Sequence, residues 1–543
     1  MRVELSYSRQ SILVIAFLAI VLTAHAQTNM QNVGVAKGFR VAGDYYEEDK
    51  PKSLIEGAEG RPIGNNVFQL TQLKLTTFES NGAPEMIILA PACLFDGNAN
   101  MASSPGPLTV QTADGQFNLQ GMGFQWSQND SMLYISNDVH SVLHKVATAG
   151  TEATPTPPDT NSDIDVFSDH FTRDLKTGLS VYEDNVRVIG TNETLTSDVM
   201  SLNLPFTNGI VTLSGHATWA NGSRNGGADL LLLDRDNNLM RAFTNAFIKL
   251  PGTAIGTNSS GTDSTNKEVV VLSDQYELRT NWSQFYGKVQ VTQYDSNQPT
   301  GKLTSEAMTV VIVGGNAIQS VHAETNVVVS QQDGQFTSDI GKFYASNSTA
   351  LFTGHATWTK GDRSGAADTL FVDQLLGQMT AWSNAMMKLP GSAMDQSTNM
   401  STVQKFTTIT SDNYLVKAGH AEFHYNAHIV DPKMNVTSEL LTADSLPGQT
   451  NIERVVADKN VVGDLIDSSG KVTHVTSQHA LYTLSDGLLR LTGTPVMQND
   501  QGWLTGSIIV WDRNYDLLIV RNQRMVFQAS AMTNGLPDLM NGK

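Results

Sequence analysis

Three histidines, His420, His424 and His428, recur every four residues in the stretch GHAEFHYNAH. On a helix this spacing would place the three imidazoles on one face, where they could bind a metal ion. The stretch alternates apolar and polar residues instead, which is typical of a β-strand. Four residues of strand span ~13 Å, and one ion with ligand bonds of ~2 Å does not bridge that gap. We therefore expect polar positions that face solvent, and no metal site.

A second candidate metal site is the stretch DRDNN, in which Asp234, Asp236 and Asn238 resemble the first ligands of a calcium loop. Leu239 stands where such a loop needs glycine, and Asn245 stands where it needs a bidentate glutamate. A hairpin turn fits these residues better. We expect no metal and no other cofactor.

Motifs of hydrolytic enzymes are missing as well. The sequence contains neither a GxSxG nucleophile elbow nor an HExxH zinc motif. Its acidic residues form no pair that recurs at equivalent positions of a repeat. We expect that the protein is not an enzyme, although a carbohydrate-active β-solenoid stays open as a minor alternative.

Composition narrows the class of protein further. The 543 residues include 35 Lys and Arg against 53 Asp and Glu, giving a net charge of −18. A nucleic-acid-binding protein would display a basic face, so we expect no nucleic acid partner. Cys93 is the only cysteine, which excludes an intramolecular disulfide, so stability must come from burial and backbone pairing.

The amino-terminal segment carries the features of a secretory signal peptide. Arg2 and Arg9 precede an apolar run from residue 12 to 24, and Ala24 and Ala26 supply the small residues of a cleavage site. The run is shorter than the ~20 residues of a membrane-spanning helix. We expect residues 1–26 to be cleaved after export, and an uncleaved inner-membrane anchor over residues 11–26 is the less favoured alternative.

Low-complexity stretches divide the rest of the chain into four blocks. The stretch around Pro155 to Pro158 is rich in Pro and Thr and has no apolar period, as in an extended linker. Two shorter breaks follow Gly256 and Asp395. The expected boundaries are a first domain at 33–146, a linker at 147–164, and three modules at 165–252 (shortened), 269–391 and 405–535.

The three modules are internal repeats. The pentapeptide GHATW occurs at Gly215–Trp219 and again at Gly354–Trp358. Residues 215–252 and 354–391, which begin with this motif and end in KLPG, agree at 20 of 38 positions without gaps. The related starts LTSD, LTSE and VTSE at 195, 303 and 436 mark each module once. Such repetition predicts one structural unit per module.

Within the modules the apolar period is two, which predicts one-sided β-strands. In TALFTGHATW, Ala356 and Trp358 share a face, and His355 lies on the other. Glycine, asparagine and aspartate recur about every ten residues and supply turns, as an antiparallel meander requires. We expect an all-β protein without long helices.

These patterns resemble a known family. The cycle YGKVQV, LTSEAM, VHAETNVVV, GKFYA and LFTGHATW, and its last form ending in LTGTPV and LTGSIIVWDR, is similar to the OstA-like (LptA) periplasmic proteins of lipopolysaccharide export. The first block, with IEGAEGRPIGNNVFQLTQLKLTTFES, resembles the related LptC family. The resemblance covers most of the chain after residue 33.

The resemblance implies tandem antiparallel β-jellyrolls, or taco-like open folded sheets, that form an extended apolar trough. The implied function is the periplasmic binding of lipopolysaccharide or a similar glycolipid and its transfer between inner and outer membranes, as part of outer membrane biogenesis. Implied partners are other Lpt-type export components, joined through sheet edges, or a second copy of the chain. The alternative is a structural or adhesive secreted β-repeat protein whose apolar faces form closed cores.

The alternating pattern gives the residues expected to face the trough. They are Ala217, Trp219, Phe285, Val289, Val291, Val321, Ala323, Val327, Phe352, Ala356, Trp358, Phe423, Tyr425 and Leu491.

Overall fold

The computed structural model describes residues 34–43, 45–46, 50–144, 163–203, 209–252, 267–313, 317–331, 334–390, 406–446, 452–467, 469–500 and 502–527. The expected signal peptide at 1–26 and nearly all of the linker at 147–164 lie outside these residues. Their cleavage and conformation therefore stay predictions.

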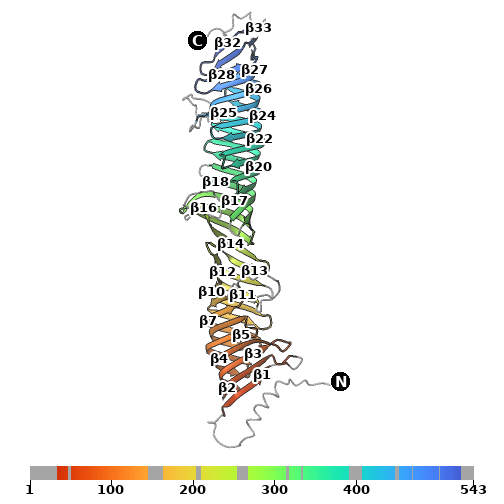
Figure 1. The fold of residues 1–543 in the computed structure, drawn as a ribbon, viewed down its shortest axis with the longest axis vertical. Coiled ribbons are helices and arrows are strands. Elements are labelled where there is room, and N and C mark those ends of the chain that lie inside the picture. Colours follow the sequence, from red (N-terminus) through yellow and green to blue (C-terminus); the bar gives the residue numbers. More distant parts are fainter. Residues whose placement is uncertain are drawn as a thin grey trace, which may run out of the picture. The chain divides into compact units, whose positions relative to one another are not determined.

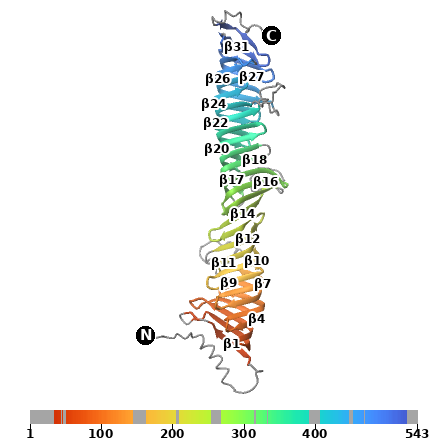
Figure 2. The same cartoon turned by 180° about the vertical axis from the view of Figure 1, so that it is seen from behind.

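Every named element in the described residues is a β-strand, and neighbouring strands pair in antiparallel fashion from the first block to the last module (Figure 1 and Figure 2). The expected all-β antiparallel fold is confirmed. Among the described residues no helix has the length and apolarity to cross a membrane.

The chain divides into two compact units, 1–246 and 247–543, whose boundary falls within β14. The strands that begin in the first unit are β1 (Ala36–Ala42), β2 (Ser53–Gly64), β3 (Val67–Phe78), β4 (Pro84–Asp96), β5 (Met101–Thr112), β6 (Phe117–Ser127), β7 (Met132–Leu143), β8 (Ile164–Ser168), β9 (His170–Asp174), β10 (Leu179–Ile189), β11 (Glu193–Asn203), β12 (Ile210–Asn221), β13 (Arg224–Asp234) and β14 (Leu239–Pro251).

The second unit continues the same pattern. Its strands are β15 (Lys267–Leu278), β16 (Trp282–Asp295), β17 (Gln298–Val313), β18 (Ala317–Gln331), β19 (Gly334–Tyr344), β20 (Thr349–Lys360), β21 (Arg363–Asp373), β22 (Gln378–Pro390), β23 (Phe406–Lys417), β24 (His420–Asp431), β25 (Met434–Ser445), β26 (Ile452–Ile466), β27 (Val472–Thr483), β28 (Leu488–Thr492), β29 (Val496–Asn499), β30 (Gly502–Thr505), β31 (Ile508–Asp512), β32 (Leu517–Arg521) and β33 (Arg524–Phe527).

Most long strands bend sharply near their middle, and the repeated GHATW motif lies at such a corner. Gly354 and His355 have φ angles of 76° and 48°, in the left-handed region, and the strand register shifts between Thr353 and Ala356. Nδ1 of His355 lies 3.0 Å from a carboxylate oxygen of Asp339 on the neighbouring strand. The glycine thus permits a β-bulge at this corner.

The same corner recurs on alternate strands. Two consecutive residues with positive φ form it, and they are either glycine and histidine or a pair whose second residue is asparagine. An acidic residue on the adjacent strand accepts a hydrogen bond from the asparagine or pairs with the histidine. Seven such pairs among the described residues are Asn185–Asp169, His216–Asp198, Asn245–Asp229, His355–Asp339, Asn384–Asp368, Asn426–Asp412 and Asn460–Glu439.

The corners fold each unit into two walls that meet along the corners and end in two lips. In the second unit, the first lip contains the turns after β23, β27 and β31, and the second lip contains the turns after β24, β26 and β29. In the first unit, the first lip contains the turns after β6 and β9, and the second lip contains those after β3 and β5. A flat strand of 12 residues such as β24 would separate the two lips by about 37 Å.

Candidate functional site

The apolar interior between the two walls is the candidate site, and most of the predicted residues lie in it. The structure buries Ala217, Trp219, Phe285, Val289, Ala323, Val327, Phe352, Ala356, Trp358, Phe423 and Leu491, and it half-buries Val291 and Val321. His355 faces solvent, as its strand pattern predicts. Whether these residues contact a lipid stays a prediction.

The inward orientation predicted for Tyr425 is wrong, because its side chain is 64% exposed. Strict alternation from Phe423 would turn Tyr425 inward. Tyr425 and Asn426 instead form the corner of β24, with φ angles of 58° and 49°. The corner carries both residues outward, and the inward pattern resumes at Ala427, which is fully buried.

Hydrogen bonds cross the interior from wall to wall. In the second unit, Nε1 of Trp358 donates to the hydroxyl of Tyr414 at 2.7 Å, and both side chains are buried. In the first unit, the hydroxyl of Tyr182 donates to Oγ of Ser141 at 2.9 Å. Burial raises the pKa of Tyr414 to about 12 and also raises that of Tyr182. Both phenols therefore stay neutral and able to donate at physiological pH.

Aromatic rings also fill the space between the walls. Phe336 and Phe352 come from opposite walls and stack with ring centroids 5.0 Å apart. Phe117 and Phe171 pack in the same manner in the first unit, at 6.3 Å. At these places the walls contact each other directly, which is the closed-core arrangement that the sequence left open.

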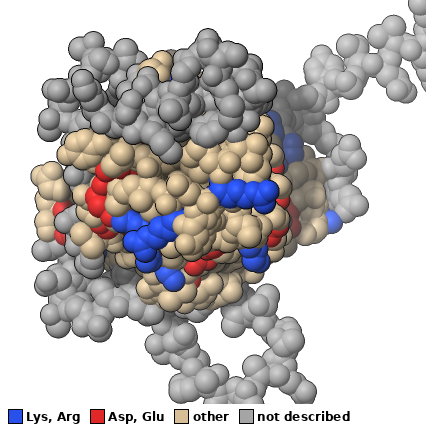
Figure 3. Space-filling view, turned by 90° about the horizontal axis from the view of Figure 1, so that it is seen from above, with Lys and Arg blue, Asp and Glu red and all other residues tan. Residues whose placement is uncertain are grey.

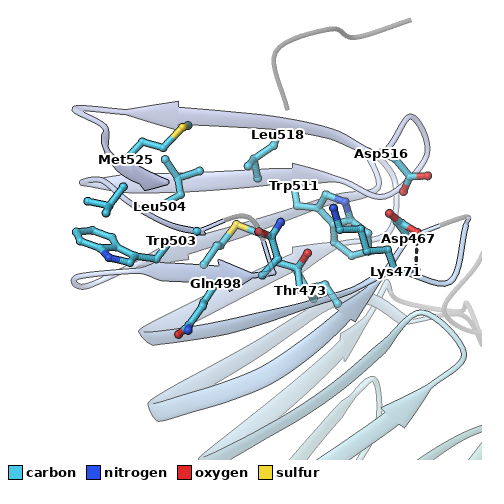
Figure 4. Close-up of a pocket in the computed structure, with 15 residues that line it drawn as sticks. Asp467, Lys471, Thr473, Gln498, Trp503, Leu504, Trp511, Asp516, Leu518 and Met525 are labelled. Carbon is cyan, nitrogen blue, oxygen red and sulfur yellow. Dashed lines mark hydrogen bonds between the residues drawn. The ribbon is translucent and has the colours of Figure 1, made fainter. Parts of the chain in front are cut away.

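The walls separate towards the end of the second unit. After β27 the sheet splits into β28, β31 and β32 on one side and β29, β30 and β33 on the other. Between them lies a cavity of about 170 Å³ (Figure 4). Its lining combines apolar side chains, which include Met497, Trp503, Leu504, Trp511 and Leu518, with polar ones, which include Asp467, Lys471 and Asp516. The backbone N–H of Lys471 donates to Asp467 at its rim.

A buried ion pair joins the lips near this cavity. Nη2 of Arg513, on the first lip, donates to Oδ1 of Asp431, on the second lip, at 2.7 Å. Their side chains are only 4% and 2% exposed. The hydroxyl of Thr407 donates to Oδ2 of the same carboxylate at 3.0 Å.

The first unit has an equivalent ion pair. Nη2 of Arg173, on the first lip, lies 3.2 Å from Oε1 of Glu85, on the second lip. The hydroxyl of Thr77 donates to the other oxygen of Glu85 at 3.3 Å. Each unit therefore closes its lips with a threonine, an acid and an arginine.

The three histidines of β24 are held apart by other partners. His420 contacts both Asp444 and Glu422, His424 contacts Glu422, and His428 contacts Asn435. Within the described ranges no group of three or more His, Cys, Asp or Glu side chains is arranged to hold a metal ion.

The calcium-like stretch closes the turn between β13 and β14. Asn237 donates to both carboxylate oxygens of Asp234, through its side chain and its backbone, and these hydrogen bonds lower the pKa of Asp234. The predicted turn is confirmed.

Charge is mixed on the surface at the carboxyl-terminal end, and the thiol of Cys93 is buried. Figure 3 views the carboxyl-terminal end and shows basic and acidic side chains next to each other on a mostly uncharged surface. Cys93 is buried, and burial raises the pKa of its thiol to about 12, so this thiol is unreactive at neutral pH.

The fold and the site define an all-β protein of two units, each with an apolar interior between its walls, and with a cavity near the end of the second unit. No protein-family model matches the chain, and no curated protein matches its sequence. Among solved structures, the chain is similar to LptH, the LptA homologous periplasmic component of the lipopolysaccharide transport device from Pseudomonas aeruginosa. The two are 16% identical, the match covers 22% of this chain and 94% of LptH, and the TM-score is 0.21. At these values we infer no function from the likeness.

Proposed function

We propose that this protein is an exported, periplasmic carrier that holds the acyl chains of lipopolysaccharide or a similar glycolipid in its apolar interior and passes them between the inner and outer membranes. The observation that carries the proposal is the continuity of that interior. One cluster of buried apolar side chains extends from Ala350 on β20 to Trp511 on β31 and leads to the terminal cavity. Burial of a hydrocarbon chain there needs no catalytic residue, and we propose no enzymatic step.

The proposed partners are other export components of the Lpt type, or a second copy. In the described part of the chain, β32 pairs only with β31 and β33 only with β30. Their outer edges therefore present backbone N–H and C=O groups that a partner strand can satisfy.

A structural or adhesive repeat protein is the second candidate function. The contacts between the walls, such as the hydrogen bond from Trp358 to Tyr414, favour it, because they fill the interior with protein. A carrier must exchange such contacts for lipid, whereas a structural module keeps them.

Photo-crosslinking at the cavity separates the two functions. A benzophenone-bearing residue in place of Trp503, which lines the cavity, should label lipopolysaccharide after ultraviolet illumination. The matched control replaces Tyr515, an aromatic residue that is 82% exposed, and should stay unlabelled. Absence of labelling at both positions, with no lipid in organic extracts of the purified protein, would favour the structural module.

A further inference from the structure

We propose that Thr407, Asp431 and Arg513 form a latch across the lips of the second unit, and that an acyl chain with an anionic head group opens it by replacing Asp431 on the arginine. The ligand in this proposal rests on the proposed lipid-carrier function. The latch itself rests only on geometry.

The pair of Arg513 and Asp431 lies across the two lips of the second unit. Strand pairing places Arg513 and Asp431 at opposite lips, which a flat sheet would hold tens of ångströms apart. Their contact at 2.7 Å therefore joins the walls where the fold would otherwise open. The pair closes the space between the walls along its open side.

The second step is the chemistry of the pair. A buried ion pair contributes little net stability, because desolvation of two charges offsets their attraction. Arginine carries five N–H donors in a planar fork that suits two-point binding of a carboxylate or phosphate. In the described residues, Nε and Nη1 of Arg513 have no hydrogen-bond partner. The guanidinium thus has donors for a second anion while Asp431 occupies only Nη2.

The equivalent arginine of the first unit makes more hydrogen bonds than Arg513 does. Arg173 bonds Glu85 and also donates to Oγ of Ser180 at 3.1 Å and to the carbonyl of Gly178 at 3.4 Å. No such side-chain and carbonyl bonds hold Arg513 among the described residues, beyond Asp431 and the ring of Tyr482 at 5.6 Å. Of these two arginines, Arg513 is held by fewer hydrogen bonds to side chains and carbonyls.

The third step is the place of the latch beside the cavity. Trp511, two residues before Arg513, lines the cavity. Leu465, which lines the opposite wall, pairs with Met434 just after Asp431. The cavity thus ends beside the latch, although Arg513 itself does not line it, and we place the anionic head group of a chain held there at the vacant donors of the arginine.

The experiment measures the distance between the lips. Spin labels on cysteines at Tyr515 and Pro432, exposed positions on the two lips, report it by pulsed electron resonance in the full chain. The native Cys93 is buried and stays unlabelled. Sodium palmitate should lengthen the distance, whereas methyl palmitate and inorganic phosphate should not. If inorganic phosphate alone lengthens the distance, the ligand that opens the latch is a free anion, and the proposal of an acyl chain with an anionic head group is overturned.

Two variants test the exchange of partners. Asp431→Asn removes the competing carboxylate at constant size and should tighten palmitate binding by about tenfold, the effect of one charge-assisted hydrogen bond. The double variant Arg513→Gln with Asp431→Asn removes both charges and should abolish the preference for palmitate over methyl palmitate. If the double variant does not fold, Arg513→Lys should keep the preference and weaken binding, because lysine retains the charge without the fork.

The two proposals fail differently. Palmitate that binds without changing the distance between the lips, with the same affinity in Asp431→Asn, would overturn the latch and leave the carrier intact. Failure of both palmitate and methyl palmitate to bind would overturn the carrier and the ligand-driven opening. In that case the latch is tested without lipid. If the distance between the two spin labels is the same in Asp431→Asn as in the unsubstituted protein, the latch is overturned as well.

Discussion

Trp358 and Tyr414, which are 56 residues apart in the chain, meet across the interior of the second unit through a hydrogen bond of 2.7 Å. The indole N–H comes from the wall that ends at the second lip, and the phenol comes from the opposite wall. Two one-sided strands can bury their apolar faces only against each other or against a ligand. This contact shows that the walls cover each other at this place.

Removal of the phenol hydroxyl should therefore be costly. Tyr414→Phe leaves the buried N–H of Trp358 without its acceptor, and we expect a loss of about 1–3 kcal/mol in the free energy of unfolding. Urea unfolding of the full chain, followed by tryptophan fluorescence, measures the loss. Tyr515→Phe, at an exposed position, is the control and should leave the midpoint unchanged. Equal midpoints for both variants would mean that the walls do not meet here.

The corner at Gly354 depends on the absence of a side chain. A Cβ added there would collide with the carboxylate of Asp339, in a backbone conformation that alanine disfavours. Gly354→Ala should destabilise the protein by more than the ~1–2 kcal/mol of the backbone term alone. Gly377→Ala is the control, because Gly377 has a φ of 59° but open space around it. Its loss of stability therefore measures the backbone contribution alone. Thermal unfolding of both variants compares them, and equal losses would contradict a role for the carboxylate.

The pKa of His420 is raised, first by its hydrogen bond to Asp444 and then by that to Glu422. A raised folded-state pKa stabilises the fold fully below the unfolded value of ~6.5, and the contribution is lost as pH rises through the folded pKa. We expect the stability from this cluster to fall as pH rises above about 6.5. Nuclear magnetic resonance titration should show a lower pKa for His420 in Asp444→Asn. An unchanged pKa would assign the shift to other groups.

The sequence predicts the class of fold because a period of two survives in nearly every strand. Ala356, Trp358 and Val289 take the burial that alternation requires. The histidine spacing on β24 belongs to a strand, as predicted, for the same reason. Burial of this kind depends only on the local pattern, so one sequence is enough to show it.

The latch and the corners cannot be predicted from the alternation of apolar and polar residues within one strand. Asp431 and Arg513 are 82 residues apart, and their contact depends on how far the walls bend, which no local pattern states. Each looks like an ordinary charged turn residue. The corners have a signal in the sequence, since the LTSD and VTSE starts contain Asp198 and Glu439, the acids that face two of them. That signal can be interpreted only when the strand register is known. Tyr425 is mispredicted for this reason. Alternation along the strand predicts that its side chain faces the interior, but the corner interrupts the alternation.

The outward turn at Tyr425 gives the last prediction, which compares two aromatic residues on one strand. Phe423 is fully buried beside Tyr414, with ring centroids 5.6 Å apart, so Phe423→Ala should cost about 3–5 kcal/mol through the cavity it leaves. Tyr425→Ala removes an exposed side chain and should change stability by less than about 0.5 kcal/mol.

Urea unfolding of the two alanine variants under one set of conditions checks the comparison. Asn426→Ala is a further control for the corner, because it removes the hydrogen bonds of 3.1 Å to Asp412 and leaves the inward residues untouched. It should cost less than Phe423→Ala and more than Tyr425→Ala. A large loss for Tyr425→Ala would mean that this side chain lies inside, that β24 runs in strict alternation, and that the corner between Phe423 and Ala427 is absent in solution.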